Sequence, residues 1–400
     1  MAAATLVVVG ADPMRARAFA AWARAGLRTV LVNGSSHARY EHLVDDYAHL
    51  DVRDEQSPDL DRLAALARGC DGVTTLADGS LVTAAGLAER LGLPGPGVEA
   101  ARTSRSKPAQ RRLAQKHELR APWALPVRSP DDLESFFAQS GGPGVLKPAD
   151  AAASTAVYRV VDVGDATARW PEVRSLSPSG TGIIEDYVEG PEVSVEAVVV
   201  EGNLLRASVT TKETGGPTGF LELAHTVVSD DDLLPEATAA VEQVVRAWSI
   251  GSAVLHAEFK LSPEGLELIE AAARPAGDLI PELVEVALGR DLYLSQAALA
   301  LGDDPPPDRP RVASCAGIRF ALASGVVRRQ VAPAEVVPGL DRIRLAEQLF
   351  QPGRRLPPLI ANWTRSAYVL GWSDELEPLR AELEEATERI AALMGVSIHA

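Results

Sequence analysis

The sequence predicts a multidomain protein of mixed α/β and α+β architecture, with a parallel sheet covered by helices at its start. Three observations support this fold class. The chain has 400 residues, which is more than one ordinary hydrophobic core holds. Its first part alternates strand-like apolar runs with helical spacing, and two segments rich in proline and glycine interrupt the remainder of the chain.

The first hundred residues have the pattern of a β-α-β domain. Apolar, β-branched runs are separated by a stretch of helical spacing that contains no glycine or proline. Strands joined in this way lie parallel and carry helices on the faces of their sheet. The expected elements are a strand at 5–9, a helix at 14–25, a strand at 27–32, a strand at 72–76 and a helix at 81–91.

The turn after the first strand argues against a dinucleotide site. It reads Gly10-Ala11-Asp12 and holds a single glycine. A pyrophosphate-binding turn uses three glycines in the spacing G-x-G-x-x-G. The sequence therefore does not favour NAD at this turn.

Two loop-like segments predict where domains meet. Leu93 to Gly97 reads Leu-Pro-Gly-Pro-Gly, and Gly302 to Pro307 reads Gly-Asp-Asp-Pro-Pro-Pro. After the second segment, short strand-like runs precede one long helix at Asp374 to Leu393. The expected division is an N-terminal domain at 1–100, a central domain at 101–310 and a small C-terminal α+β region at 311–400.

Charge and cysteine content narrow the class of protein. The formal net charge is −16 at pH 7, which disfavours nucleic acid and anionic membranes because both attract basic surfaces. The two cysteines, Cys70 and Cys315, form no metal-binding or disulfide pattern. No leader-like N-terminus is present, and no apolar run approaches the ~20 residues that cross a bilayer. We expect a soluble, cytoplasmic protein.

The most informative stretch, residues 253–274, predicts a β-hairpin. It reads AVLHAEFKLS, then PEG, then LELIEAAAR, and a three-residue loop ending in glycine suits a type I turn followed by a left-handed residue. If Ser262 pairs with Leu266, three facing pairs result. They are Glu258 with Glu270, His256 with Ala272, and Lys260 with Leu268.

Two glutamates on one face of a hairpin indicate a cation site. Directly opposite residues have Cβ atoms ~5 Å apart, and two carboxylates that close repel unless a cation lies between them. Oxygen ligands on rigid strands suit Mg²⁺, and Arg274 on the same face suits an anion. A solvated face with weak surface pairs is the alternative. The apolar flanks, Val254, Leu255 and Leu266 among them, favour a buried sheet instead.

This hairpin resembles that of the ATP-grasp superfamily, in particular the branch of L-amino acid ligases and other carboxylate–amine ligases. The family pattern is roughly H-x-E-F-K followed by E-x-N-x-R-x-x-G. It stands here as His256-Ala257-Glu258-Phe259-Lys260 and Glu270-Ala271-Ala272-Ala273-Arg274-Pro275-Ala276-Gly277. Further similar segments, in the family's order, are Ser106-Lys107, Val145-Leu146-Lys147-Pro148 and Ile184-Glu185-Asp186-Tyr187-Val188-Glu189-Gly190-Pro191-Glu192.

The resemblance implies a fold and an activity. The fold would be an ATP-grasp fold with an N-terminal parallel-sheet domain, a central ATP-grasp domain and a C-terminal ligase region. The activity would be ADP-forming ligation of a small carboxylic or amino acid to an amine through an acyl-phosphate. ATP and Mg²⁺ would be required, with Mn²⁺ as an alternative metal. Dimers are common in such a family, so a homodimer is left open.

The resemblance also implies roles for individual residues. Lys107 and Lys147 would offset phosphate charge, and a loop with Ser154 and Thr155 would close over the phosphates. The remaining roles are Glu185, Tyr187 and Val188 for adenine, Glu192 for ribose, Glu258 and Glu270 for the metal, and Arg274 for the transferring phosphoryl group. Arg274, Gly277 and His225 would face the acid substrate. For His225 a structural role is equally open, and for His256 a structural role is favoured.

Two departures from the family pattern leave alternatives open. Ala272 stands where the family has asparagine, so one metal-binding oxygen is missing. The phosphate loop, Ala149 to Ala153, is rich in alanine and carries the negative Asp150. They motivate one alternative, a nucleotide-binding protein that has lost catalysis. A separate alternative is a ligase that uses a carrier-protein thiol or another nucleophile as acceptor.

Overall fold

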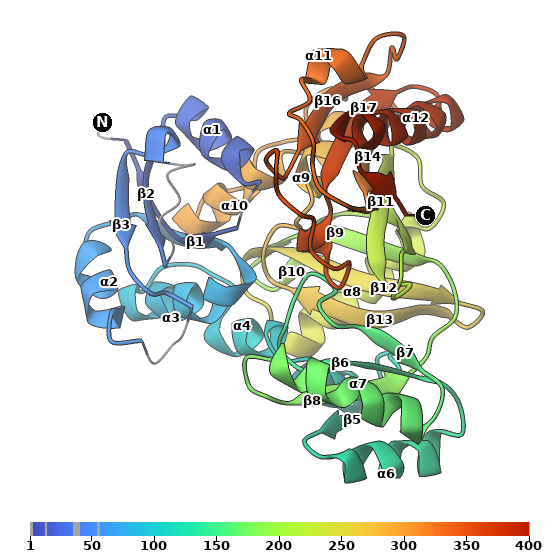
Figure 1. The fold of residues 1–400 in the computed structure, drawn as a ribbon. Coiled ribbons are helices and arrows are strands. Elements are labelled where there is room, and N and C mark those ends of the chain that lie inside the picture. The colour runs from blue at the N-terminus through green and yellow to red at the C-terminus, as the bar shows by residue number, and fades with distance from the viewer. Residues whose placement is uncertain (1–2, 13, 35–40, 54–56, 400) are drawn as a thin grey trace.

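Three sheets of four or more strands and one short strand pair organise the part of the chain that a computed structural model describes, residues 3–12, 14–34, 41–53 and 57–399. Figure 1 shows the N-terminal sheet on one side and the longest sheet in the centre. A small sheet lies below the central one, and the C-terminal region lies above it. The mixed α/β and α+β class is confirmed.

The N-terminal sheet is parallel throughout, in the order β3-β2-β1-β4. The predicted helix at 81–91 is confirmed and ends at the left-handed Gly92. The first helix begins at Ala16, two residues later than predicted, because Met14 has a φ of +73° that a helix cannot include. The elements are β1 (Thr5–Ala11), α1 (Ala16–Arg24), β2 (Arg28–Asn33), β3 (Asp46–His49), α2 (Leu60–Leu66), β4 (Gly72–Leu76) and α3 (Leu81–Leu91).

Two short helices lead into the small antiparallel sheet, which has the order β5-β8-β6-β7. Phe136 and Trp170 pack its buried face from the two helices that cover it. The elements are α4 (Val98–Ser104), α5 (Lys107–Lys116), β5 (Ala124–Val127), α6 (Pro130–Ser140), β6 (Gly144–Pro148), β7 (Tyr158–Val160), α7 (Val163–Ser175) and β8 (Gly182–Asp186).

The central sheet has eight antiparallel strands in the order β13-β12-β9-β10-β11-β14-β17-β16. The predicted boundary at residue 310 falls between β11 and β14, yet these two strands are hydrogen-bonded neighbours. The elements up to that boundary are β9 (Glu192–Val200), β10 (Asn203–Gly215), β11 (Leu221–Val228), α8 (Leu234–Trp248), β12 (Ala253–Ser262), β13 (Gly265–Ala272), α9 (Ile280–Leu288) and α10 (Leu292–Leu301).

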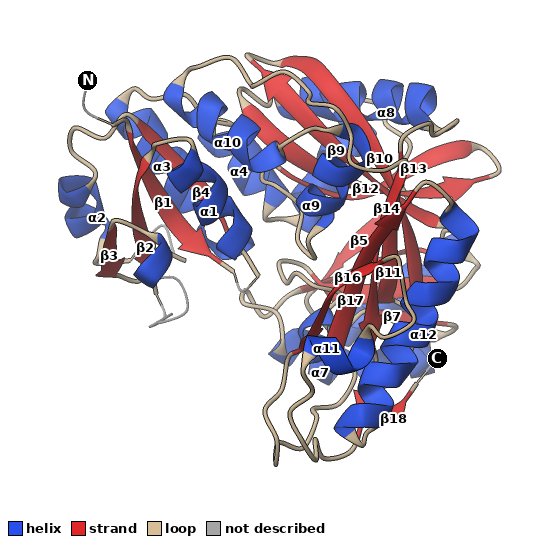
Figure 2. Ribbon diagram, turned by 90° about the horizontal axis from the view of Figure 1, so that it is seen from above, coloured by secondary structure: helices blue, strands red, loops and turns tan. Residues whose placement is uncertain are grey.

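The C-terminal region adds strands to this sheet and lays the long last helix along them (Figure 2). The predicted helix at 374–393 is confirmed within two residues. The elements are β14 (Cys315–Ala321), β15 (Ala323–Ser324), α11 (Pro333–Val336), β16 (Ile343–Gln348), β17 (Ala367–Ser373), α12 (Leu376–Met394) and β18 (Ser397–Ile398).

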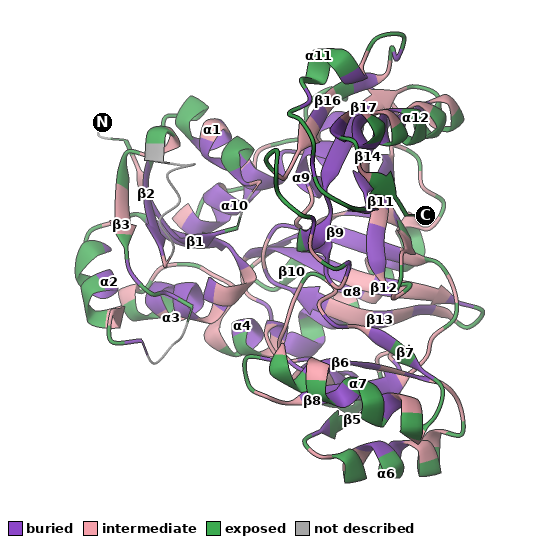
Figure 3. Cartoon of the chain, in the orientation of Figure 1, coloured by how far each residue is buried: buried purple, intermediate pink, exposed green. Residues whose placement is uncertain are grey.

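The middle of the central sheet is buried on both faces: β9 is buried along nearly its whole length, whereas Figure 3 shows much of β12 and β13 in the pink of intermediate burial. Side chains alternate along β9, so Val195 and Val199 pack toward α8, whereas Val198 packs toward α9. Each such buried valine contributes roughly 1.5–3 kcal/mol relative to exposure. Within the described ranges, no helix is long and apolar enough to cross a membrane.

Helix α10 joins the N-terminal domain to the central sheet. Trp22 of α1 donates a hydrogen bond from Nε1 to the carbonyl of Tyr293, at 2.8 Å. Gln296 donates from Nε2 to Thr74 of β4 at 2.7 Å and accepts from the amide of Val254 in β12 at 2.9 Å. One buried amide side chain therefore fixes how β4 faces β12.

The buried Glu282 of α9 predicts a dependence of stability on pH. Its Oε2 accepts from Tyr293 at 3.4 Å, and Oε1 has no hydrogen-bond partner among the described residues. Burial raises the pKa of Glu282 to about 7. Between pH 4.5 and 7 the native state therefore holds a proton that the unfolded chain releases. The free energy of unfolding falls by about 3 kcal/mol across this window from this group.

Glu282→Gln is expected to remove this part of the pH dependence. The variant should gain stability over the parent at about pH 8 and gain little at about pH 5. Urea unfolding of both proteins at a series of pH values measures the difference. Parallel curves for the two proteins would contradict the assignment.

Candidate active site

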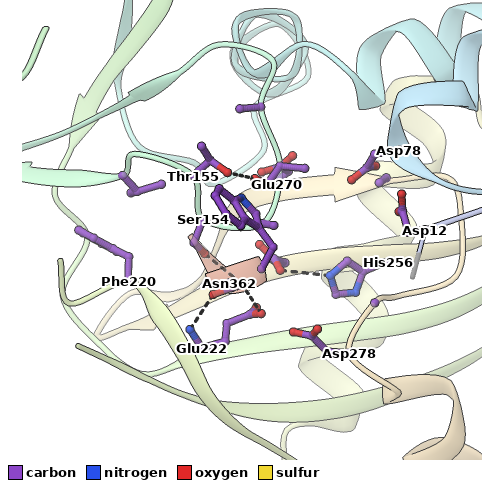
Figure 4. Close-up of a pocket in the computed structure, with 18 of the residues that line it drawn as sticks. Asp12, Asp78, Ser154, Thr155, Phe220, Glu222, His256, Glu270, Asp278 and Asn362 are labelled. Atoms are coloured by element: carbon purple, nitrogen blue, oxygen red, sulfur yellow. Dashed lines mark hydrogen bonds and ion pairs between the residues drawn. The ribbon is translucent and has the colours of Figure 1, made fainter. Parts of the chain in front are cut away.

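One cavity of about 710 Å³ lies where the N-terminal domain, the small sheet, the central sheet and the C-terminal region meet. Each part contributes a charged or polar side chain to the wall. These include Asp78, Lys147, Glu270 and Asn362. Figure 4 shows Asp12 and Asp78 on one side of this pocket and Phe220 and Glu222 on the other.

Glu258 and Glu270 lie opposite one another on β12 and β13 and both line the cavity. The predicted pairing of the two glutamates is confirmed, as is that of His256 with Ala272. The central geometric expectation of the sequence, two carboxylates on one face at a cleft, therefore holds.

The turn of this hairpin differs from the prediction. Ser262 pairs with Gly265 rather than Leu266, so Lys260 faces Glu267 rather than Leu268. Gly265 has a φ of +115°, which glycine adopts readily, and this lets the turn close one residue earlier. A bulge between Glu258 and Phe259 shifts the register back by one residue. Two departures from regular pairing thus cancel at the glutamates.

Both glutamates form ion pairs with cationic side chains of the protein. Glu270 is 3.0 Å from the ammonium of Lys107, and Glu258 accepts from Lys212 and, at 3.1 Å, from Nε2 of His256. Burial alone would raise the pKa of Glu258, but Lys212 and His256 hold it well below its usual value. Glu258 is therefore ionised at neutral pH.

The donor set fits a hard divalent cation. Two carboxylates face the cavity from rigid neighbouring strands, and oxygen is the ligand atom that Mg²⁺ prefers. Ala272 lines the same wall and offers a methyl group in place of an oxygen. The protein would thus supply fewer metal ligands than the family pattern does.

Arg274 connects the hairpin to the N-terminal domain. Its Nε and Nη2 donate to the two oxygens of Asp78, at 2.7 and 2.6 Å. Burial alone would raise the pKa of Asp78, but Arg274 lowers it well below its usual value. Gly277, three residues further on, lines the cavity with Arg274. The guanidinium is therefore held by a bidentate pair at the cavity wall.

Lys107 and Lys147 both line the cavity, whereas Glu185 does not appear on the described part of its wall. Glu185 is buried between Lys147, at 2.7 Å, and Arg111, at 2.9 Å. Burial alone would raise the pKa of Glu185, but these two cations lower it. The structure pairs Glu185 with both Lys147 and Arg111, and its role toward adenine stays a prediction.

Tyr187 and Val188 follow β8 and likewise lie outside the described residues that line the cavity. The amide of Tyr187 donates to the carbonyl of Pro143 at 3.0 Å. Arg159 stacks on its ring with its central carbon 4.5 Å from the ring centre. Their predicted adenine contacts are untested by this geometry.

The alanine-rich loop with Ser154 and Thr155 forms part of the cavity wall. Asp150, the negative residue of this loop, also lines the cavity. Its carboxylate accepts from the Ser177 hydroxyl at 2.6 Å and from the Ser179 amide at 2.9 Å. Two donors therefore hold this charge at its own end of the loop.

A buried lysine that the sequence did not single out lies among three carboxylates. Lys212 belongs to β10, and its ammonium lies 2.7 Å from Glu222 and 3.7 Å from Glu192 and also contacts Glu258. Burial opposes the charge of Lys212, but the three glutamates raise its pKa well above the usual value. Burial itself raises the pKa of Glu192. The alternation of polar residues along β10 was the available signal.

The two histidines differ in exposure to the cavity. His225 is fully buried and is not among the described residues that line the cavity. Its Nε2 lies 3.3 Å from Asp278. His256 lines the wall and bridges Glu196 and Glu258. Burial opposes protonation of His256, but Glu196 raises its pKa to about 9. These contacts hold His256 between two glutamates, and its structural role stays a prediction.

Asp278 and Arg365 form a second charged wall that sequence reasoning missed. Arg365 donates to Asp278 at 2.8 and 2.5 Å and lies 3.6 Å from the centre of the Phe320 ring. Asp278 follows Gly277 directly and has a left-handed φ of +54°. No motif marks Arg365, because it reaches the cavity from a segment far along the chain.

The chain matches two family models. One, described as an ATP-grasp N-terminal domain, matches residues 19–95. The other, described as an ATP-grasp domain, matches residues 140–282. Together they account for more than half of the 400 residues. The first match covers β2, β3 and β4 of the parallel sheet, and the second covers both glutamates of the hairpin.

Similar proteins include two curated ligases. Human carnosine synthase 1 is 29% identical over 378 residues, which cover 83% of this chain but 45% of that protein. Alanine–anticapsin ligase of Bacillus subtilis (strain 168) is 25% identical over 299 residues, covering 67% of this chain and 63% of that one. The chain thus spans less than half the length of the human relative.

Among solved structures, an L-amino acid ligase from Bacillus licheniformis has a TM-score of 0.82 at 20% identity. The match covers 100% of this chain and 99% of that one, and at this identity it shows the shared fold. Fold, family models and hairpin geometry agree. The chain belongs to the ATP-grasp superfamily.

Proposed function

We propose that this protein is an ATP-dependent ligase that joins a small carboxylic or amino acid to an amine and releases ADP and phosphate. The observation that carries the proposal is the facing pair Glu258 and Glu270 at a cavity that Lys107, Lys147 and Arg274 also line. Paired carboxylates beside three cations suit a nucleotide bound with a divalent metal.

The metal and nucleotide would use residues at one side of the cavity. Glu258 and Glu270 would hold Mg²⁺, or Mn²⁺, which the same oxygen donors suit. Bound there, the metal would neutralise charge on the phosphates. Lys107 and Lys147 would add positive charge from the protein, and the loop with Ser154 would cover the phosphates. Glu185, Tyr187, Val188 and Glu192 are proposed for the nucleoside.

The reaction would proceed in two steps. The substrate carboxylate attacks the γ-phosphorus, ADP leaves, and an acyl-phosphate forms. The amine then attacks the acyl carbon and expels phosphate. Arg274 would stabilise the negative charge that develops on the transferred group, and its pair with Asp78 would keep it oriented. Positioning and electrostatics do most of the work in such a reaction.

The relatives favour an amine acceptor over a thiol. Two of them are named as a synthase of carnosine and a ligase of alanine and anticapsin. A nucleotide-binding protein without ligase activity is the second candidate, and Ala272 on the cavity wall favours it.

A substrate panel tests these candidates. Amino acids and other small acids are combined with amines, and ADP and phosphate release are measured with ATP and Mg²⁺. We expect ADP release that depends on both an acid and an amine, with an amide detected by mass spectrometry. Release that occurs only with an acyl carrier protein would favour the thiol acceptor. Nucleotide binding without turnover across the panel would favour the second candidate.

A further inference from the structure

The alanine-rich loop of the cavity is fastened to the C-terminal region. The backbone N–H of Asn362 donates to the carbonyl of Ala153 at 2.9 Å, and the backbone N–H of Ala156 donates to the carbonyl of Ile360 at 3.1 Å. The side-chain nitrogen of Asn362 lies 3.4 Å from the hydroxyl of Ser154. Residues about two hundred positions apart in sequence therefore set the position of this loop.

The loop backbone depends on these contacts. Ala153, Ser154 and Ala156 have φ values of +58°, +51° and +49°, and none of them is a glycine. Left-handed backbone costs free energy for residues with a side chain, and surrounding contacts must hold it in place. Two of these three residues hydrogen-bond to the segment at 360–362 through their backbone.

Asn362 also binds a carboxylate of the substrate cavity. Its Nδ2 donates to Oε2 of Glu222 at 2.6 Å, and its Oδ1 accepts from the Glu222 amide at 3.0 Å. Figure 4 shows Asn362 between Ser154 and Glu222. Glu222 in turn holds Lys212, which holds Glu258. A continuous line of polar contacts thus runs from the loop to the hairpin.

Both partners of this contact are nearly closed to solvent. Asn362 is 6% exposed and Glu222 is 8% exposed. Water therefore competes weakly for these hydrogen bonds, and losing one leaves a buried carboxylate oxygen short of a donor. The contact between Asn362 and Glu222 is therefore expected to stay formed in solution.

We propose that Asn362 is a positioning residue that couples the Glu222 end of the cavity to closure of the loop at 149–156. This inference rests on the proposed ligase function. Asn362 contacts Glu222 with its side chain and holds Ala153 with its backbone, so a displacement of Glu222 by a substrate changes the position of the loop. A closed loop keeps water from the acyl-phosphate.

The consequence for chemistry is a side reaction. When the loop is loose, water attacks the acyl carbon in place of the amine and expels phosphate. The free acid returns, so the net change is hydrolysis of ATP to ADP and phosphate. Loss of Asn362 should therefore raise the ADP formed per amide rather than stop ADP formation.

Asn362→Ala in the full chain tests this inference by two measurements. Hydrogen exchange of a peptide covering 149–157, in protein without ligands, should be roughly tenfold faster than in the parent, as expected for the loss of one buried hydrogen bond. The ratio of ADP to amide, measured with the best substrate pair of the panel, should rise several-fold. Asn203→Ala is the matched control, since Asn203 is the exposed first residue of β10 and its side chain bonds only to the nearby carbonyl of Glu201.

A second set of variants guards against misfolding of the first. Asn362→Asp keeps the shape but places two carboxylates together, so exchange of the loop should again accelerate. Adding Glu222→Gln to this variant restores the hydrogen bond, with the glutamine at 222 now donating to the aspartate at 362. Hydrogen exchange of the loop should then slow toward the parent's rate. A general structural role would not produce this rescue.

Two outcomes would overturn the inference. Suppose that the parent makes amide and that Asn362→Ala changes neither the hydrogen exchange of the loop nor the ratio of ADP to amide. That result would refute the coupling and leave the ligase function standing. A parent that makes no amide with any pair would refute the ligase function and this inference with it.

Discussion

Glu270→Gln is expected to abolish metal-dependent ADP release while the fold stays intact. The amide keeps the size of the side chain and an oxygen for Lys107, which now lies 3.0 Å from the carboxylate. It removes the charge that would hold the metal. Since metal charge is worth several kcal/mol to a phosphoryl transfer, turnover should fall by roughly a thousandfold or more. ADP release across a Mg²⁺ titration, with thermal unfolding in parallel, measures both parts.

Glu267→Gln is the matched control for this variant. Glu267 lies on the same strand and faces Lys260, and it is not among the described residues that line the cavity. This control should keep the parent's activity and its response to Mg²⁺. Activity of Glu270→Gln within a few-fold of the parent's would remove Glu270 from the metal site.

Arg274→Ala is expected to cost roughly a hundred- to thousandfold in kcat/KM, as the loss of a charge-stabilising donor does. It should also destabilise the fold, because it leaves the largely but not fully buried Asp78 without its bidentate partner. Breaking a buried pair by removing one partner costs about 3–5 kcal/mol. Steady-state kinetics and urea unfolding of the same preparation separate the two effects.

The double variant Asp78→Asn with Arg274→Ala distinguishes a catalytic arginine from a structural one. Neutral asparagine no longer needs a guanidinium, so stability should recover toward the parent's. Activity should remain as low as in Arg274→Ala. Recovery of activity together with stability would mean that Arg274 acts only by holding the N-terminal domain.

The part of the site that the sequence predicted lies within one local element. Strand alternation and a short turn predicted that Glu258 and Glu270 face one another, because pairing in a hairpin follows from position alone. The predicted pairing at the turn was wrong, because no residue pattern in the sequence signals that the turn closes at Gly265 or that a bulge compensates for it. The sequence pattern therefore predicted the Glu258–Glu270 pair correctly, although the strands pair as predicted only on the side of the bulge away from the turn.

The rest of the site comes from contacts between distant segments. Arg365 meets Asp278 across 87 residues, and Asn362 meets Glu222 across 140. No periodicity or spacing encodes such meetings, which depend on how β14 and β17 add to the central sheet. The burial of Glu185 between Arg111 and Lys147 was hidden for the same reason.

The hydrogen-bonded pair β11 and β14 limits how this protein can be divided. A fragment that stops near residue 310 would leave five residues of β11, Ala224 to Val228, without their partners in β14. Exposed strand flanks of this kind recruit other chains and aggregate. Chimaeras between relatives should therefore exchange β11, β14 and β17 as one block.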